Sequence, residues 1–178
     1  MTNAHFTQHL SLARPQPQDA PDLFAIMGNT ATMEHAKSHG SGSETSRMVA
    51  QNAAQCSSVG YAPWVIRLTH DDRIVGYGGL LGETGNPDAG AQLLFHFRPG
   101  ENSDIYAVEL AEFALHRADH VLGLPTVTAL AHPLDRARHD VLKQVGFASA
   151  EFVPALQRYR YIRRAGDVRQ SATAPTSQ

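Results

Sequence analysis

The sequence predicts an α/β domain, because helix and strand patterns alternate along its C-terminal half. A long helix is predicted from Asp104 to Leu122, where apolar residues recur at steps of three and four along two seams. The run TVTALA at 126–131 is short, β-branched and apolar, which is typical of a central strand. A second helix follows with Asp135 as its N-cap, and Gly146 closes it.

The N-terminal half adds further strands and helices to the same domain. In chain order, the predicted elements are a strand at 10–14, helices at 19–27 and 44–57, a hairpin at 64–68 and 74–81, a strand at 91–97, and closing strands over 147–162 interrupted at Pro154. Glycines at 76, 78 and 79 permit close packing or a bulge in the second hairpin strand. We expect residues 1–9 to form a flexible arm, 10–162 a single domain, and 163–178 a disordered tail.

Composition excludes several classes of function. The chain has 178 residues, a net charge of −2 and no block of basic residues, which argues against a nucleic-acid surface. Its single cysteine, Cys56, permits no internal disulfide and fits a reducing cytoplasm. No apolar run reaches membrane length, and the polar N-terminus has no hydrophobic signal core. We therefore expect a soluble cytoplasmic protein without nucleic-acid or membrane partners.

Histidine pairs at helical spacing do not predict a metal site. His35 and His39 lie in a polar, glycine-rich stretch, Asn29–Ser43, with no third ligand nearby in sequence. His116 and His120 have the same spacing on the long helix and are expected to mark its exposed face. Solvated histidines are the simpler interpretation of both pairs, so we expect no metal.

Three stretches of the C-terminal half resemble the GCN5-related N-acetyltransferases (GNAT), in particular the ribosomal-protein-alanine acetyltransferase type. They are YAVELA at 106–111, HPLDRAR at 132–138 and VLKQVGF at 141–147. The resemblance covers roughly Leu10 to Ile162. It implies a central mixed, mostly antiparallel twisted sheet of six to seven strands, splayed between the fourth and fifth and flanked by about four helices. It also implies acetyl-CoA as cofactor, a primary amine of a small molecule or protein N-terminus as acceptor, and a possible homodimer.

The family's pyrophosphate cradle, Q/R-x-x-G-x-G/A, corresponds here to residues 102–107. Ile105 stands where the family has glycine, so its branched side chain is expected to hinder close approach of a phosphate. Asp104 adds a carboxylate that would repel a pyrophosphate at the helix N-terminus. Either the cradle binds weakly or the helix no longer binds nucleotide. The predicted cofactor contacts in this turn are Asn102, Ser103, Asp104, Ile105, Tyr106 and Ala107.

The strand at 91–97 is the second point of comparison with the family. Gln92 stands where related sequences carry a glutamate that is a candidate base, and an amide cannot accept a proton usefully. His96 lies on the same strand face and is our candidate base, since its unperturbed pKa suits neutrality. The alternative is that His96 has only a structural role in the strand. Backbone N–H groups near Leu94 and Phe95 are expected to polarise the thioester, and Phe95 and Phe97 join the predicted cofactor contacts.

Two family positions in HPDNxxS have also changed. Asp135 and Arg138 replace the asparagine and serine that approach coenzyme A in the family, and Arg138 can either bind phosphate or pair with Asp104 and close the pocket. The loop at 29–43 corresponds to a region near the family's acceptor entrance, or is a solvated connection. We predict an acyl-CoA-dependent N-acetyltransferase that works by direct attack. The alternative is a catalytically silent GNAT-like module that has lost acetyl-CoA binding.

Overall fold

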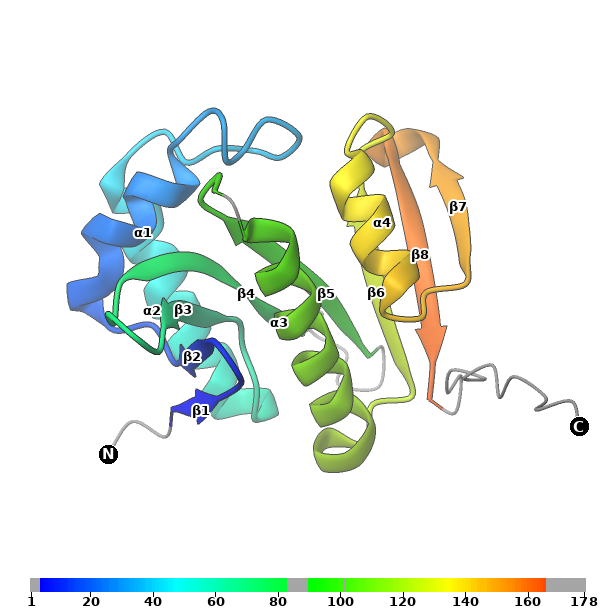
Figure 1. The fold of residues 1–178 in the computed structure, drawn as a ribbon, viewed down its shortest axis with the longest axis horizontal. Coiled ribbons are helices and arrows are strands. Elements are labelled where there is room, and N and C mark those ends of the chain that lie inside the picture. Colours follow the sequence, from blue (N-terminus) through cyan, green and yellow to red (C-terminus); the bar gives the residue numbers. More distant parts are fainter. Residues whose placement is uncertain (1–3, 83–89, 101, 166–178) are drawn as a thin grey trace, which may run out of the picture.

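A computed structural model of the chain describes residues 4–82, 90–100 and 102–165, and within them an eight-stranded sheet forms the centre of the molecule (Figure 1). The strand order is β1-β2-β3-β4-β5-β6-β8-β7, and every neighbouring pair is antiparallel except β5 and β6. The strands are β1 (His5–Phe6), β2 (Leu10–Ala13), β3 (Trp64–Leu68), β4 (Ile74–Gly82), β5 (Ala91–Phe97), β6 (Thr126–Ala131), β7 (Ser149–Val153) and β8 (Arg158–Arg164). The predicted α/β class and mixed, mostly antiparallel sheet are confirmed, with the two-residue β1 as an additional strand.

Helices cover both faces of the sheet. On one face, α1 (Ala20–Met27) and α2 (Gly42–Val59) enclose a core with Val65 and Tyr77. On the other face, α3 (Ser103–Arg117) and α4 (Arg136–Gln144) bury their apolar residues against Leu93 and Val127. In Figure 1, α3 crosses in front of β4 and β5. No helix among the described residues is long and apolar enough to span a bilayer.

A glycine on β4 allows α3 and β5 to approach closely. A Cβ atom on Gly78 would lie 2.6 Å from the carbonyl oxygen of Leu94 and 2.9 Å from Cδ2 of Leu110. Both distances are shorter than real Cβ contacts, so only glycine fits between strand and helix. The predicted close packing at this glycine is thus confirmed.

Helix ends follow their predicted caps. The long helix ends in a π-helical turn over residues 118–122, and Gly123 then takes a φ of 61°. Asp135 caps α4 by accepting a hydrogen bond from the N–H of Arg138 at 3.0 Å. Gly146, with a φ of 98°, follows α4. These local signals confirm the predicted boundaries to within a few residues.

The structure extends the folded region beyond its predicted limits at both ends. His5 and Phe6 pair with β2 inside the segment predicted as a loose arm, and His9 Nδ1 lies 2.7 Å from Oε2 of Glu109 on α3. At the other end, Arg163 lies in β8 and donates to both carboxylate oxygens of Asp119, at 2.9 and 2.6 Å. Residues 1–3, 83–89 and 101 lie outside the described residues, as does 166–178, which is most of the predicted tail.

Candidate active site

The two parallel strands at the centre of the sheet separate part-way along their length. Ala91–Leu93 of β5 pairs with Val127–Ala129 of β6, and the pairing stops there. From Leu94 onward β5 pairs with β4 alone, while β6 continues its ladder with β8. This is the predicted splay between the fourth and fifth strands of the family fold. It leaves one edge of β5 facing a gap between the two halves of the sheet.

The backbone of Phe95 faces this gap. Its carbonyl accepts a hydrogen bond from Nη2 of Arg138 at 2.6 Å, and Arg138 belongs to α4 on the far side of the gap. Since the N–H and C=O of one strand residue point to the same neighbour, the N–H of Phe95 faces the gap too. An unpaired strand edge of this kind can hydrogen-bond an extended, amide-containing ligand.

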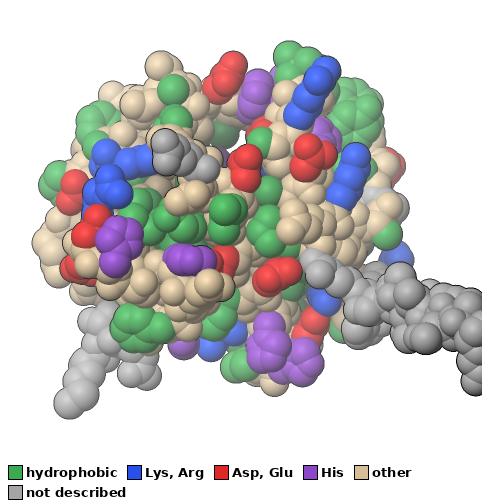
Figure 2. Space-filling model, in the orientation of Figure 1, with side chains coloured by type: hydrophobic (Ala, Val, Ile, Leu, Met, Phe, Trp, Pro, Cys, Tyr) green, Lys and Arg blue, Asp and Glu red, His purple; other side chains and the backbone are tan. Residues whose placement is uncertain are grey.

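A cavity of about 380 Å³ lies over the gap, on the side of α3 and α4. Figure 2 shows the hollow near the top of the view. The loop between α1 and α2, strand β5, and the N-terminal ends of α3 and α4 all contribute to its wall. Its lining residues are Ala31, Thr32, Glu34, His35, Ala36, Phe95, His96, Phe97, Ser103, Asp104, Ala107, Leu134, Asp135, Arg136, Ala137, Arg138 and Val141. The first N–H groups of a helix lack partners and carry partial positive charge, so two helix N-termini here favour an anion.

The α1–α2 loop reaches across the splay rather than running free in solvent. His35 stacks on His132, at the end of β6, with ring centroids 5.1 Å apart and planes 7° from parallel. Thr32 lines the cavity, and its hydroxyl oxygen is buried without a hydrogen-bond partner among the described residues.

Some residues of the turn at 102–107 line the cavity, and others lie outside it. Ser103, Asp104 and Ala107 line the cavity. Ile105 lies outside it: its side chain is 56% exposed and lines a separate hollow with Val108 and Asp140. The helix therefore turns this side chain away from the cavity.

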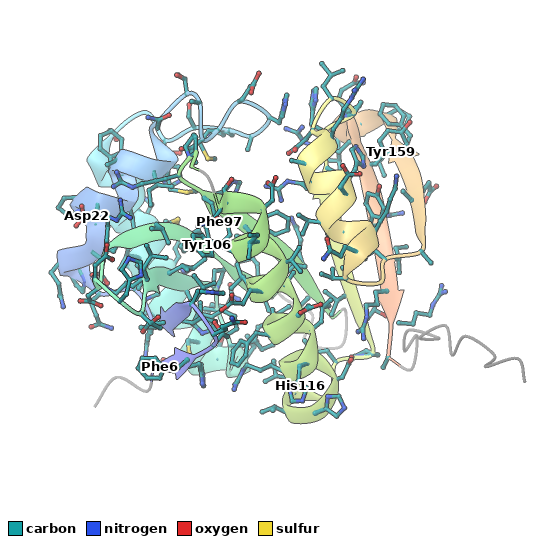
Figure 3. The ribbon with its side chains drawn as sticks, viewed as in Figure 1. Phe6, Asp22, Phe97, Tyr106, His116 and Tyr159 are labelled. Carbon is teal, nitrogen blue, oxygen red and sulfur yellow. The ribbon has the colours of Figure 1, made fainter. Side chains whose placement is uncertain are left out.

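Two more predicted contacts at this turn lie off the cavity lining. Asn102 is the N-cap of α3 without a side-chain capping bond, and its Nδ2 lies 3.5 Å from the hydroxyl of Tyr106. The Tyr106 ring packs toward Phe97, with centroids 6.3 Å apart (Figure 3). Tyr106 therefore supports the cavity wall from behind.

Arg138 pairs with Asp135, and the alternative pairing with Asp104 is wrong. Its Nε lies 3.1 Å from Oδ2 of Asp135, while its guanidinium carbon lies 4.3 Å from the centre of the Phe95 ring. Burial lowers the pKa of Arg138 and the charge of Asp135 opposes this shift, but the guanidinium remains protonated at neutral pH. Arg138 therefore holds α4 to β5 across the splay with a fixed positive charge.

His96 lies where the two halves of the site meet. It lines the cavity just described and also a groove of about 1050 Å³ on the opposite, α1–α2 face of the sheet. Burial, together with the charges of Arg138 and His39, lowers the pKa of His96 to about 3. Its imidazole is therefore neutral at pH 7, and the expectation of an ordinary histidine pKa is wrong. The side chain can accept or donate a hydrogen bond there, but it is a weak base.

The groove on the α1–α2 face contains residues that sequence analysis did not single out. Its floor holds a buried pair in which Asn52 Nδ2 donates to the hydroxyl of Tyr77 at 2.6 Å, and burial raises the pKa of Tyr77 to about 12. Tyr77 and His96 are register partners on neighbouring strands, so their side chains lie on the same face of the sheet. The groove is lined by Met27, Met48, Gln51, Asn52, Ala54, Gln55, Ser58, Val59, Tyr77, Leu81, Gly82, Gln92, Leu94 and His96.

The comparisons with known proteins agree with this architecture. Residues 9–148 match the family model described as "Acetyltransferase (GNAT) domain", which is more than three-quarters of the chain. The chain belongs to the GNAT acetyltransferase family. Among proteins of curated function, sequence comparison finds no significant match.

Solved GNAT structures share the fold at low sequence identity. An acetyltransferase from Agrobacterium tumefaciens is 18% identical, with a TM-score of 0.75 over 92% of this chain and 95% of that one. Spermidine N-acetyltransferase from Vibrio cholerae, in complex with CoA and spermine, is 13% identical, with a TM-score of 0.74 over 90% and 98%. A ribosomal-protein alanine acetyltransferase from Vibrio fischeri is 14% identical, with a TM-score of 0.69 over 93% and 98%. At these identities the likeness shows the fold alone.

Proposed function

We propose that this GNAT protein transfers an acetyl group from acetyl-CoA to a primary amine by direct attack. One observation carries the proposal: His96 is the only described residue that lines both the cavity over the strand gap and the groove on the opposite face. Two ligands that enter from opposite faces of the sheet therefore meet beside one strand residue. Solved relatives that acetylate spermidine and ribosomal-protein alanine support an amine as the acceptor class.

The cavity fits the phosphopantetheine arm of coenzyme A. The edge of β5 beside the splay and the two helix N-termini supply polar groups for phosphates and amides. Asp104 is the unfavourable element, since its carboxylate repels phosphate. When bound, acetyl-CoA supplies an acyl thioester that a neutral amine can attack, with the thiolate as leaving group.

The chain's own residues position the amine and orient the carbonyl. The Phe95 N–H faces the gap and is placed to donate to an oxygen there, as an oxyanion donor does. The neutral imidazole of His96 can accept a hydrogen bond from the incoming amine and orient its lone pair. Since His96 holds a proton poorly, the amine must arrive neutral or lose its proton to water.

Calorimetry with acetyl-CoA and an assay of thiol release with an amine panel test this function. Ser103→Asp adds a carboxylate to the cavity wall at a helix N-terminus, where acids do not harm folding, and is expected to weaken acetyl-CoA binding at least tenfold. Ser46→Asp, on an exposed site of α2 outside both linings, is the matched control and should bind like the wild type. No binding of acetyl-CoA by the wild type would remove the proposal.

The silent-module alternative also has an observation in its favour. Arg138 already donates a hydrogen bond to the carbonyl of Phe95. An extended ligand would use this same group at the strand edge. If this contact closes the edge, coenzyme A binds neither to the wild type nor to Ser46→Asp. Any heat of binding that Ser103→Asp abolishes would decide for the transferase.

A further inference from the structure

The groove on the α1–α2 face has a mainly apolar wall. Met27, Met48, Val59, Leu81 and Leu94 supply aliphatic and thioether surface from α1, α2, β4 and β5. Methionine side chains adapt to irregular apolar bodies. The groove volume of about 1050 Å³ reaches the upper end of ligand sites, which run from roughly 300 to 1000 Å³. The space therefore accommodates a ring-sized apolar group.

The polar groups of the groove are uncharged. Four amides, Gln51, Asn52, Gln55 and Gln92, lie among its described lining residues, and none of those residues carries a carboxylate, lysine or arginine. A buried ammonium without an anionic partner loses its hydration and gains nothing comparable from amides. A ligand with a second or third ammonium is therefore disfavoured here.

The buried pair in the floor cannot supply charge either. Asn52 and Tyr77 are each 3% exposed, and their mutual hydrogen bond joins α2 to β4. Burial keeps the Tyr77 hydroxyl protonated through the physiological range. Because Tyr77 accepts from Asn52, its own hydrogen remains available for a neutral acceptor atom on a ligand. The Asn52–Tyr77 pair can therefore form a hydrogen bond with an uncharged polar group of a ligand, but not an ion pair.

The groups around His96 favour a neutral amine at the reaction point. On the groove side, Tyr77 of β4 is the register partner of His96, and neither it nor any other described lining residue of the groove is an anion at neutral pH. An amine that enters this environment is desolvated, which favours its neutral, nucleophilic form. The uncharged lining on the groove side therefore selects against retained ammonium groups.

Building on the proposed function, we infer that the acceptor is a small monoamine with an apolar, ring-sized and uncharged body, and that polyamines are poor acceptors. The amino group reaches His96 at the strand gap, and the body lies along Leu94, Met48 and Met27. The new N–C bond forms as the C–S bond breaks, and the amine's proton leaves to solvent. The amides along α2 then determine which body is accepted.

An acceptor panel tests this inference with full-length protein and acetyl-CoA, using thiol release as the readout. For 2-phenylethylamine we expect kcat/KM at least tenfold above that for spermidine and for a peptide with an N-terminal alanine. Equal or better turnover of spermidine or the peptide would overturn the substrate class while leaving the acetyltransferase intact. Failure of all three amines would instead remove the proposed function together with the inference.

A charge substitution locates the acceptor in the groove. Gln51 is exposed on α2 and lines the groove, so Gln51→Glu adds a carboxylate without disturbing a buried contact. We expect KM for spermidine to fall roughly fivefold, as a partly exposed ion pair of about 1 kcal/mol allows. Gln18→Glu makes the same change at an exposed site outside both linings and should leave KM unchanged. Equal KM values in the two variants would place the acceptor elsewhere and overturn the assignment.

Discussion

The two faces of β5 border sites of different character. On one face, Phe95 and Phe97 line a cavity together with Arg138, Asp135 and two helix N-termini. On the other face, Leu94 and His96 line a groove that has no charged side chain among its described residues. The two linings lie a few ångströms apart because side chains alternate along a strand. One strand can therefore separate a polyanionic cofactor from an amine acceptor. Among the described residues, His96 lines both sides, next to the splay between β5 and β6.

At neutral pH, the largest effect is expected from filling the space between β4, β5 and α3. Gly78→Ala places a Cβ atom 2.6 Å from the carbonyl oxygen of Leu94 and 2.8 Å from Cα of Phe95, so the strand that carries both linings must shift. We expect a loss of about 1–3 kcal/mol in the free energy of unfolding, measured with urea, because overpacked sites relax poorly. Gly42→Ala, with no atom within 4 Å of the new Cβ, is the control. Equal stability of both variants would show that β5 can move freely.

A pH titration of stability is expected to reveal the neutral His96. Its pKa is lowered to about 3 in the folded state, so below about pH 6.5 the unfolded chain binds a proton that the folded protein does not. Stability should therefore fall from pH 6.5 toward pH 3, by up to about 1.4 kcal/mol per pH unit. His96→Gln should remove this part of the slope. His5 and His39, whose pKa values burial also lowers, remain in both proteins. Parallel curves would contradict a buried neutral His96.

The buried pair in the groove gives a smaller effect. Tyr77→Phe removes the hydroxyl that accepts from Asn52 and should cost about 1 kcal/mol of unfolding free energy, as for a typical hydrogen bond. The apolar body of the groove stays in place, so turnover of a ring-bearing monoamine should persist. Tyr159→Phe, at a half-buried ring of β8 outside both linings, serves for comparison. A larger loss in Tyr159→Phe would contradict the importance of the pair.

The smallest effects are expected from substitutions of Asp104 and Ile105, two neighbouring residues at the start of α3. Asp104 lines the cavity, so Asp104→Asn should tighten acetyl-CoA binding by roughly two- to fivefold, the range expected for one charge at a helix N-terminus. Ile105 points away from the cavity, so Ile105→Ala should change the affinity less than about twofold, within the same electrostatic range. Calorimetry measures both. A tightening in Ile105→Ala alone would mean that the turn rearranges on binding.

Signals that act within a few residues were sufficient for much of the fold. Caps at Asp135, Gly123 and Gly146 end or begin helices through local hydrogen bonds and positive φ, so sequence spacing predicts them well. The splay and the cavity location also followed from the family resemblance. Eight of the residues predicted for the site, His96 among them, line the cavity, although their roles stay predictions.

The errors concern interactions between segments far apart in the chain. Arg138 pairs with Asp135 and the Phe95 carbonyl rather than with Asp104, because Asp135 lies at the N-cap of the same helix and the carbonyl faces Arg138 across the splay. The orientation of Ile105 depends on the rotation of α3 about its axis, which packing of Leu110 and Ala111 sets. The groove residues Asn52 and Tyr77 are 25 positions apart, and no short motif joins them.

By itself, the sequence determined the order of helices and strands and their caps, since these depend on periodicity and short-range geometry. Its resemblance to a known family implied the sheet that opens beside β5. The tertiary structure alone decided which charges meet and how strongly each group is desolvated. For that reason His96 is neutral and weakly basic, although its residue type suggested an ordinary base. Electrostatic character at this site depends on burial and on partners brought together by folding.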